Sequence, residues 1–215
     1  MILILLAMIL VSNLSAEGAP VKAGLVTSFS PTGVDKNVAN NAAFKVTFAE
    51  PIVPKEKVGQ VLPVEDFPFE VMPSIQAEGR WLDQSTFSAS LLAPLNMATA
   101  YIASIKEDLK TLKGKNVGGG AYSFRTAAPS LLSARATASG GREVNVRLDF
   151  NMPVFPSRLR GFLTISDTQG RRLEYRISGG VSKSVNASVA AGGNNRLLVR
   201  IAAGLTGEAG NLAFE

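Results

Sequence analysis

The chain has 215 residues and a net charge of +5, with 46% hydrophobic and 18% charged residues, so it can bury one large or two small cores. It contains no histidine and no cysteine. Those absences remove disulfides, the usual transition-metal ligands and the Ser-His and Cys-His nucleophile systems, and they exclude most common hydrolase chemistry. We therefore expect a protein that is not an enzyme and carries no cofactor.

An apolar run opens the chain. It extends from Ile2 to Val11, is shorter than the roughly 20 residues that span a bilayer, and is followed by the small residues Ser15 and Ala16. This pattern predicts a secretory signal peptide over residues 1–16, although the first basic residue is Lys22 and no basic segment precedes the run. A buried core strand is the alternative, disfavoured because the run does not alternate. Export would place the protein in the periplasm or outside the cell, associated with the envelope.

Strand patterns begin after Pro20. Leu25 to Ser30 predicts a short strand before a Pro/Gly turn, and Phe44 to Phe48 alternates apolar and polar residues before Pro51. Prolines then recur as far as Pro73. Because proline lacks the N–H that a central ladder needs, we expect strands in this segment to be short or at a sheet edge.

Three more alternating stretches follow, at Thr86–Leu91, Thr99–Ile105 and Ala121–Thr126. The single tryptophan, Trp81 in a Gly-Arg-Trp sequence, is predicted to fill the core between two sheets rather than to serve as a ligand platform. The glycines at 118–120 lack the strand-loop-helix context of a phosphate-binding loop, so they predict a flexible hairpin tip. A linker is expected at Ala127–Pro129.

The rest of the chain repeats this pattern. Val144, Val146, Leu148 and Phe150 share one face of a stretch that ends at Pro153, which lies 102 positions after Pro51. Three other matches are 96 positions apart: Ile105 and Ile201, Leu109 and Leu205, and Gly114 and Gly210. The drop from 102 to 96 predicts a second, slightly shorter copy of the first module.

Two features of the second copy carry expectations of their own. Asp167–Gly170 predicts a hairpin turn between strands at Phe162–Ile165 and Leu173–Ile177, and Arg196–Ile201 alternates again. At an offset of 96 the closing strand would fall at residues 218–222, beyond Glu215. The second module is therefore expected to lack its last strand and to leave an unpaired edge, as in the leading piece of a longer protein or a truncated reading frame.

Together these patterns predict an all-β chain of two tandem antiparallel Ig-like β-sandwich modules, at residues 17–127 and 128–215, the second one truncated. The predicted core residues of the first module are Phe44, Val46, Phe48, Trp81, Tyr101 and Phe124. Those of the second are Val146, Leu148, Phe150, Leu198 and Ile201.

All of the net charge falls in the second module. Residues 1–126 hold eleven basic and eleven acidic residues, whereas residues 127–215 hold eleven and six. An arginine-rich face would suit an acidic partner, such as an anionic envelope component or a neighbouring acidic domain. The alternative, a solvated sheet face whose arginines pair with Asp and Glu, is favoured. Nucleic acid is not expected, because export separates the chain from it and no aromatic stacking motif accompanies the arginines.

Carboxylates are the remaining candidates for chemistry, at Glu65-Asp66, at Glu107-Asp108 and at Asp149 with Asn151. Adjacent residues on a strand point to opposite faces, so the first two pairs are poor acid-base pairs. Asp149 and Asn151 lack the dense spacing of a calcium loop. Met152 is expected to fill core space. We predict no catalytic, cofactor-binding or metal-binding residue and no small-molecule substrate.

The first module resembles the bacterial Ig-like domain of the SbsA type, specifically the copy near the N-terminus of bacterial alpha-2-macroglobulin-like proteins. The matching segments, in that family's order, are Phe29–Gly33, Val46–Val53, Gly79–Trp81, Ala98–Tyr101 and Tyr122–Thr126 leading to Pro129. The second module, through Val146–Val154, is similar to the macroglobulin-type β domain that follows.

This resemblance implies the N-terminal scaffold of a periplasmic peptidase inhibitor, a trap in which a host or competitor peptidase cuts a bait segment and is enclosed. Longer members form a thioester from Cys and Gln, but this chain has no cysteine, and bait and thioester regions would lie C-terminal to these residues. No trapping residue is carried over. The alternatives are an Ig-like structural or adhesion protein of the cell envelope and a truncated gene fragment.

Overall fold

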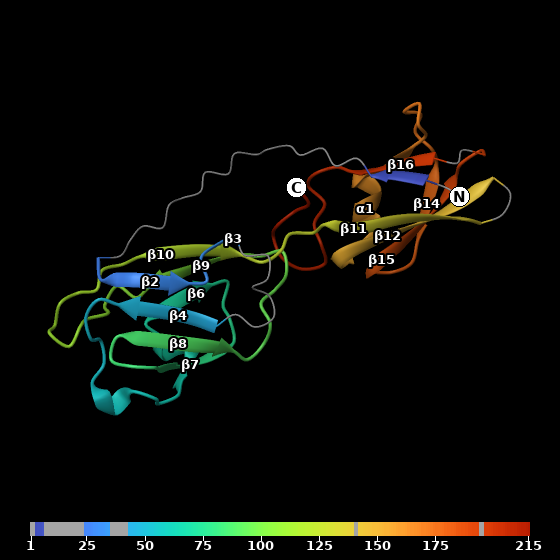
Figure 1. The fold of residues 1–215 in the computed structure, drawn as a ribbon. Coiled ribbons are helices and arrows are strands. Elements are labelled where there is room, and N and C mark those ends of the chain that lie inside the picture. The colour runs from blue at the N-terminus through green and yellow to red at the C-terminus, as the bar shows by residue number, and fades with distance from the viewer. Residues whose placement is uncertain (1–2, 7–23, 35–42, 140–141, 194–195) are drawn as a thin grey trace. The chain divides into compact units, whose positions relative to one another are not determined.

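The computed structural model describes residues 3–6, 24–34, 43–139, 142–193 and 196–215 (Figure 1). The chain forms two compact units that divide between Ala127 and Ala128, at the expected linker, and the strand Leu3–Leu6 belongs to the second of them. Each unit is built from mostly antiparallel sheets, so the predicted all-β, Ig-like class is confirmed.

The first module is a sandwich of two sheets with the strand orders β2-β4-β8-β7-β5 and β3-β10-β9-β6. Its strands are β2 (Val26–Ser30), β3 (Gly33–Val34), β4 (Ala43–Phe48), β5 (Leu62–Pro63), β6 (Phe69–Met72), β7 (Ala77–Trp81), β8 (Thr86–Leu91), β9 (Ala100–Ile105) and β10 (Ala121–Arg125). Two 3-10 turns, η1 (Lys55–Lys57) and η2 (Val64–Asp66), interrupt the proline-rich segment. As predicted there, β5 and β6 are short and each lies at a sheet edge.

Aromatic side chains fill the space between these two sheets. All six predicted core residues of this module are buried, with at most 4% of their surface exposed. The Trp81 ring centroid lies 5.3 Å from that of Phe87 and 5.9 Å from that of Phe48, which confirms its core position. Tyr101 stacks on Phe124 at 5.1 Å, joining β9 to β10.

The glycine-rich stretch is not where the hairpin turns. The tip lies at residues 111–114, where the Gly114 amide donates to the Thr111 carbonyl oxygen (2.9 Å) and Gly114 has a φ of 78°. The glycines at 118–120 lead into β10, and the Gly120 carbonyl accepts from the Ile105 amide (2.8 Å). The predicted tip was wrong because glycine marked an approach to a strand rather than a turn.

The second module has the sheets β11-β12-β15-β14 and β1-β16-β13. Its elements are β1 (Leu3–Leu6), β11 (Leu131–Ala138), β12 (Glu143–Val154), α1 (Pro156–Phe162), β13 (Leu163–Ser166), β14 (Tyr175–Ser178), β15 (Ser182–Ala190) and β16 (Arg196–Ile201). The short helix α1 was not expected; Pro156 begins it, and proline's fixed φ suits the first helical position.

The ladders of the two modules match in detail. β2 pairs with β4 through Val26 and Phe48, and β11 pairs with β12 through Leu131 and Phe150. A bulge follows that pair in both ladders. β9 and β16 also begin and end 96 positions apart. The predicted repeat is therefore a repeat of structure.

The correspondence continues past the last strand. The Glu208 amide donates to the Pro153 carbonyl oxygen (3.0 Å), as the Leu112 amide donates to that of Pro51 (2.9 Å). These donors are 96 positions apart and the prolines 102, which are the two offsets in the sequence. The segment after β16 thus packs like its counterpart after β9.

Among the described residues of the second module, β3, β5 and β10 of the first module have no counterpart. The Phe214 amide donates a hydrogen bond to the Leu205 carbonyl oxygen (2.7 Å), as the Val117 amide does to the Leu109 carbonyl oxygen (2.9 Å). β10 begins four positions after Val117, whereas the described residues of the second module include no strand after β16.

The edge of β16 is nevertheless paired, and the prediction of an unpaired edge is wrong. β1 lies parallel to β16, with Leu3 opposite Arg196 and Leu6 opposite Val199 (Figure 1, dark blue beside red). Exposed N–H and C=O groups at a sheet edge pair with an extended segment that can reach them. β1 falls inside the predicted signal peptide, which stays a prediction; residues 1–2 and 7–16 lie outside the described residues.

Two predictions within the second module need correction. Leu197 and Val199 are buried, whereas Leu198 is only half-buried; alternation puts Leu198 on the outer face with Arg196 and Arg200. Ile201 is partly buried and packs on the core, while Val146, Leu148 and Phe150 are buried as predicted.

The turn after β13 forms as predicted, but its two strands do not stay together. The Gly170 amide donates to the Asp167 carbonyl oxygen (3.1 Å), and Ser166 forms an isolated antiparallel β-bridge with Arg172. β13 then pairs with β16 and β14 with β15, so the chain crosses from one sheet to the other instead of forming a hairpin.

Candidate functional site

Asp149 is the centre of a polar cluster on the outer face of the β11-β12-β15 sheet. Its carboxylate accepts hydrogen bonds from the hydroxyls of Ser184 (2.6 Å) and Ser133 (2.9 Å) and from Nε of Arg147 (2.9 Å). These bonds, that of Ser184 first, lower the pKa of Asp149 from 3.8 to about 2. A carboxylate held ionised by three strands braces the sheet and is a poor proton acceptor.

Asn151 lies near Asp149 in sequence but is bonded to a different segment. Its Oδ1 accepts from the Ser130 amide (2.8 Å), and its Nδ2 donates to the Ala128 carbonyl oxygen (2.8 Å). The side chain thus fixes the start of the second module. The two candidates for calcium binding are engaged separately, which does not suit a shared ion.

The other candidate carboxylates are surface groups. Glu65 and Asp66 lie in η2, and Glu107 and Asp108 lie in the turn after β9; all four are exposed. Across the described ranges, no three His, Cys, Asp or Glu side chains are grouped so as to hold a metal ion. Met152 is buried with 2% of its surface exposed, as expected of core filler.

Asp167 is the buried carboxylate of the second module, with 3% of its surface exposed. Burial would raise its pKa, but hydrogen bonds from the Arg171 and Gln169 amides and the charge of Arg171 outweigh that effect, so the pKa is lowered. Nε of Arg171 donates to the carboxylate at 3.1 Å. The side chain therefore closes the turn after β13, which gives it a structural role.

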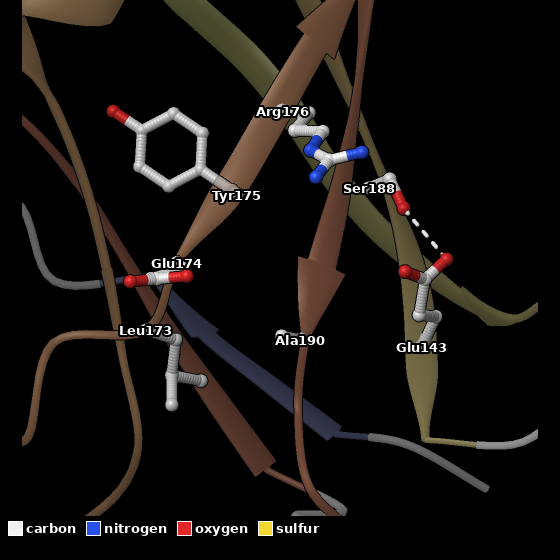
Figure 2. A pocket seen from close by; sticks show the side chains of 7 residues that line it. All are labelled: Glu143, Leu173, Glu174, Tyr175, Arg176, Ser188 and Ala190. Atoms are coloured by element: carbon white, nitrogen blue, oxygen red, sulfur yellow. Dashed lines mark hydrogen bonds between the residues drawn. The ribbon is translucent and has the colours of Figure 1, made fainter.

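A groove opens at the end of the β12-β15-β14 sheet, with a volume of about 340 Å³. Its lining residues are Glu143, Leu173, Glu174, Tyr175, Arg176, Ser188 and Ala190. Figure 2 shows Glu143 and Ser188 on one side of Ala190 and Glu174 with Leu173 on the other. Glu143 is opposite Ala190 in the ladder, and the Ala190 amide donates to the Glu174 carbonyl oxygen (3.0 Å). Because the side chain of Ala190 is only a methyl group, it does not fill the space between these residues.

The groove contains polar groups without the arrangement of an enzyme site. The Ser188 hydroxyl donates to the Glu143 carboxylate (3.1 Å), but among the described residues no third group orients this pair as an activated nucleophile requires. The Tyr175 hydroxyl donates to the Leu163 carbonyl oxygen (2.7 Å), and burial raises its pKa. The groove can hold a polar ligand by hydrogen bonds and offers no evident chemistry.

Some arginines of the second module have side-chain partners and others do not. Arg147 and Arg171 form ion pairs with Asp149 and Asp167, as the solvated-face interpretation expects. In the described ranges, no hydrogen bond or ion pair is found for the side chains of the exposed residues Arg135, Arg196 and Arg200. Positive charge is therefore available at the outer faces of both sheets of this module.

Residues 21–126 match the sequence profile of the bacterial Ig-like domain. The first module is a bacterial Ig-like domain. This confirms the coarser part of the resemblance, and Ig-like domains of this family occur in bacterial surface and extracellular proteins. The match does not extend to the second module, and no comparison identifies a macroglobulin domain or an alpha-2-macroglobulin.

Two further comparisons add little to this Ig-like identity. Among solved structures, the chain is similar to an L,D-transpeptidase from Mycobacterium tuberculosis H37Rv, at 17% identity and a TM-score of 0.31. That alignment covers 73% of this chain and 60% of the transpeptidase chain. The comparison with curated protein sequences gives no match. None of the described helices is long and apolar enough to cross a membrane.

Sequence reasoning did not find the groove beside the Ig-like repeat. Its residues come from β12, β14, β15 and the segment that leads into β14, and the register of these strands brings them together. The signal that the sequence offered was the alternation of polar and buried residues along a strand. Glu143, Asn145 and Arg147 alternate with buried residues, as do Asn186 and Ser188. That pattern identifies an outer face without saying which strands are neighbours.

Proposed function

We propose that this chain is an exported, non-catalytic Ig-like scaffold of the bacterial cell envelope. The observation that carries the proposal is the tandem repeat of one Ig-like sandwich in which the main polar clusters, around Asp149, Asn151 and Asp167, brace strands and turns. Such modules serve as spacers and as binding surfaces. The known occurrence of this domain type in surface and extracellular proteins supports the location.

Export can be tested by fusing residues 1–34 to a reporter enzyme that is active only outside the cytoplasm. We expect activity from the native segment and none from a variant carrying Leu5→Arg and Ile9→Arg, because charges interrupt the apolar run that a signal peptide needs. Equal inactivity of both fusions, with both proteins present in the cell, would remove the export part of the proposal.

A narrower proposal is that the scaffold leads a periplasmic peptidase inhibitor of the alpha-2-macroglobulin-like type. The order of the motifs between Phe29 and Pro129 supports it. On this proposal the native protein contains further β domains and a protease-sensitive segment. A native product near 22.6 kDa would contradict this narrower proposal and leave the envelope scaffold in place.

A further inference from the structure

The edge of β16 takes a strand. In the first module the equivalent edge of β9 pairs antiparallel with β10, with Ala121 opposite Ser104 and Arg125 opposite Ala100. In the second module the corresponding edge pairs with β1 instead, in the parallel direction. The same side of the sandwich is thus completed by different segments running in opposite directions, which shows that the edge accepts an added strand.

The side chains of β16 set the chemistry of that strand. Leu197 and Val199 point into the core, with at most 1% of their surface exposed, so residues opposite them should be apolar. Arg196 and Arg200 are exposed on the outer face, and in the described ranges neither side chain forms a hydrogen bond or an ion pair. Opposite charges directly across two strands stabilise a sheet, so residues facing these arginines should be acidic.

The same arginines disfavour a second copy of this chain as the occupant. An antiparallel pair of β16 strands centred on Leu198 would place Arg196 of one copy opposite Arg200 of the other, at both ends. A parallel pair in register would place each arginine opposite itself. Like charges directly across a ladder are destabilising, and charged edge residues commonly prevent self-association of sheets.

We propose that the β16 edge is a strand-acceptor site for an extended segment of another polypeptide in which apolar and acidic residues alternate. Main-chain hydrogen bonds supply the affinity, and Arg196 and Arg200 select the charge. In the full chain Leu3–Leu6 holds this edge closed. Removal of the signal peptide, which the proposed export would bring about, takes this segment away and opens the edge. Pairing at the open edge does not itself depend on where the protein resides.

The test uses the full chain with Leu5→Pro, because proline removes an N–H from the β1 ladder and frees the edge. Two fluorescent peptides based on Ala121–Arg125 are compared by anisotropy. In one peptide glutamate replaces the first and last residues, and in the other lysine replaces them. We expect the glutamate peptide to bind at least tenfold more tightly than the lysine peptide. Arg200→Glu should remove or reverse this preference, whereas Arg135→Glu, on the other sheet, should leave it unchanged.

A second measurement covers the case in which Leu5→Pro unfolds the module. Leu3 is opposite Arg196, so Leu3→Glu should raise the denaturant midpoint of the second module relative to Leu3→Lys, and Arg196→Glu should reverse that order. Failure of the glutamate peptide to bind a folded Leu5→Pro chain, or equal binding of both peptides, would overturn the proposal. Equal midpoints of the two Leu3 variants would do the same.

Discussion

Gly79 is the position where a single methyl group tests the packing of the first module. Residue 79 lies on β7, and a Cβ there would stand 2.4 Å from Cζ of Phe87 and 2.9 Å from Cε1 of Phe67. Phe87 is fully buried, and its ring lies 4.9 Å from that of Phe67 and 5.3 Å from that of Trp81. The ring therefore has no space into which it can move.

The expected cost of Gly79→Ala follows from these contacts. Overpacking a filled core costs about 1–3 kcal/mol. Replacing glycine stiffens the unfolded chain and returns about 0.4–1 kcal/mol. The net loss should be about 1–2 kcal/mol, which lowers the urea midpoint by roughly 1 M at an m-value of about 1–2 kcal/mol/M.

Tryptophan fluorescence is the assay for Gly79→Ala, because Trp81 is the only tryptophan and lies in the first module. Gly119→Ala is the matched control: no atom lies within 4 Å of a Cβ at that position, so its midpoint should stay near that of the wild type. Phe87→Leu added to Gly79→Ala should cost less than the two single losses together. Equal midpoints for Gly79→Ala and Gly119→Ala would refute the packing argument.

Three further predictions concern both modules. Trp81→Ala should destabilise the first module by about 3–5 kcal/mol in denaturant melts followed by circular dichroism, because it leaves a cavity beside Phe87. Gly170→Ala should cost about 1–2 kcal/mol of unfolding free energy, since Gly170 has a φ of 81° and nothing crowds its Cβ; a neutral result would contradict the strain argument. The pKa of Asp149 is lowered in the folded state, so its contribution to stability is present above about pH 4 and lost as the pH falls toward 2. Ser184→Ala should raise that pKa in a carboxyl NMR titration and move the loss of stability to higher pH; an unchanged titration would show that the Ser184 bond is unimportant.

The sequence predicts most of the fold because two of its signals are physical constraints on strands. Alternation with period two identifies the buried faces of β4 and β12, and proline confines β5 and β6 to sheet edges. The two offsets of the repeat, 102 and 96, survive as matching ladders and matching backbone hydrogen bonds.

The errors arise where sequence pattern does not fix tertiary pairing. Leu197 and Leu198 are both leucines, so hydrophobicity alone does not say which one faces the core; alternation places Leu198 on the outer face with the exposed Arg196 and Arg200. The turn at Asp167–Gly170 looks like a hairpin because turn chemistry is local, whereas the crossing of β14 to the other sheet is not. The pairing of Leu3–Leu6 with β16 joins the two ends of the sequence, a separation at which no local pattern is informative.

The most direct test of the envelope-scaffold account is an immunoblot of cell fractions from the source organism, with an antibody against residues 25–129. The account predicts that the signal lies in the envelope or periplasmic fraction and that N-terminal sequencing of the native protein finds a start after residue 16. A signal confined to the cytosol, on a protein that still carries residues 1–16, would contradict it.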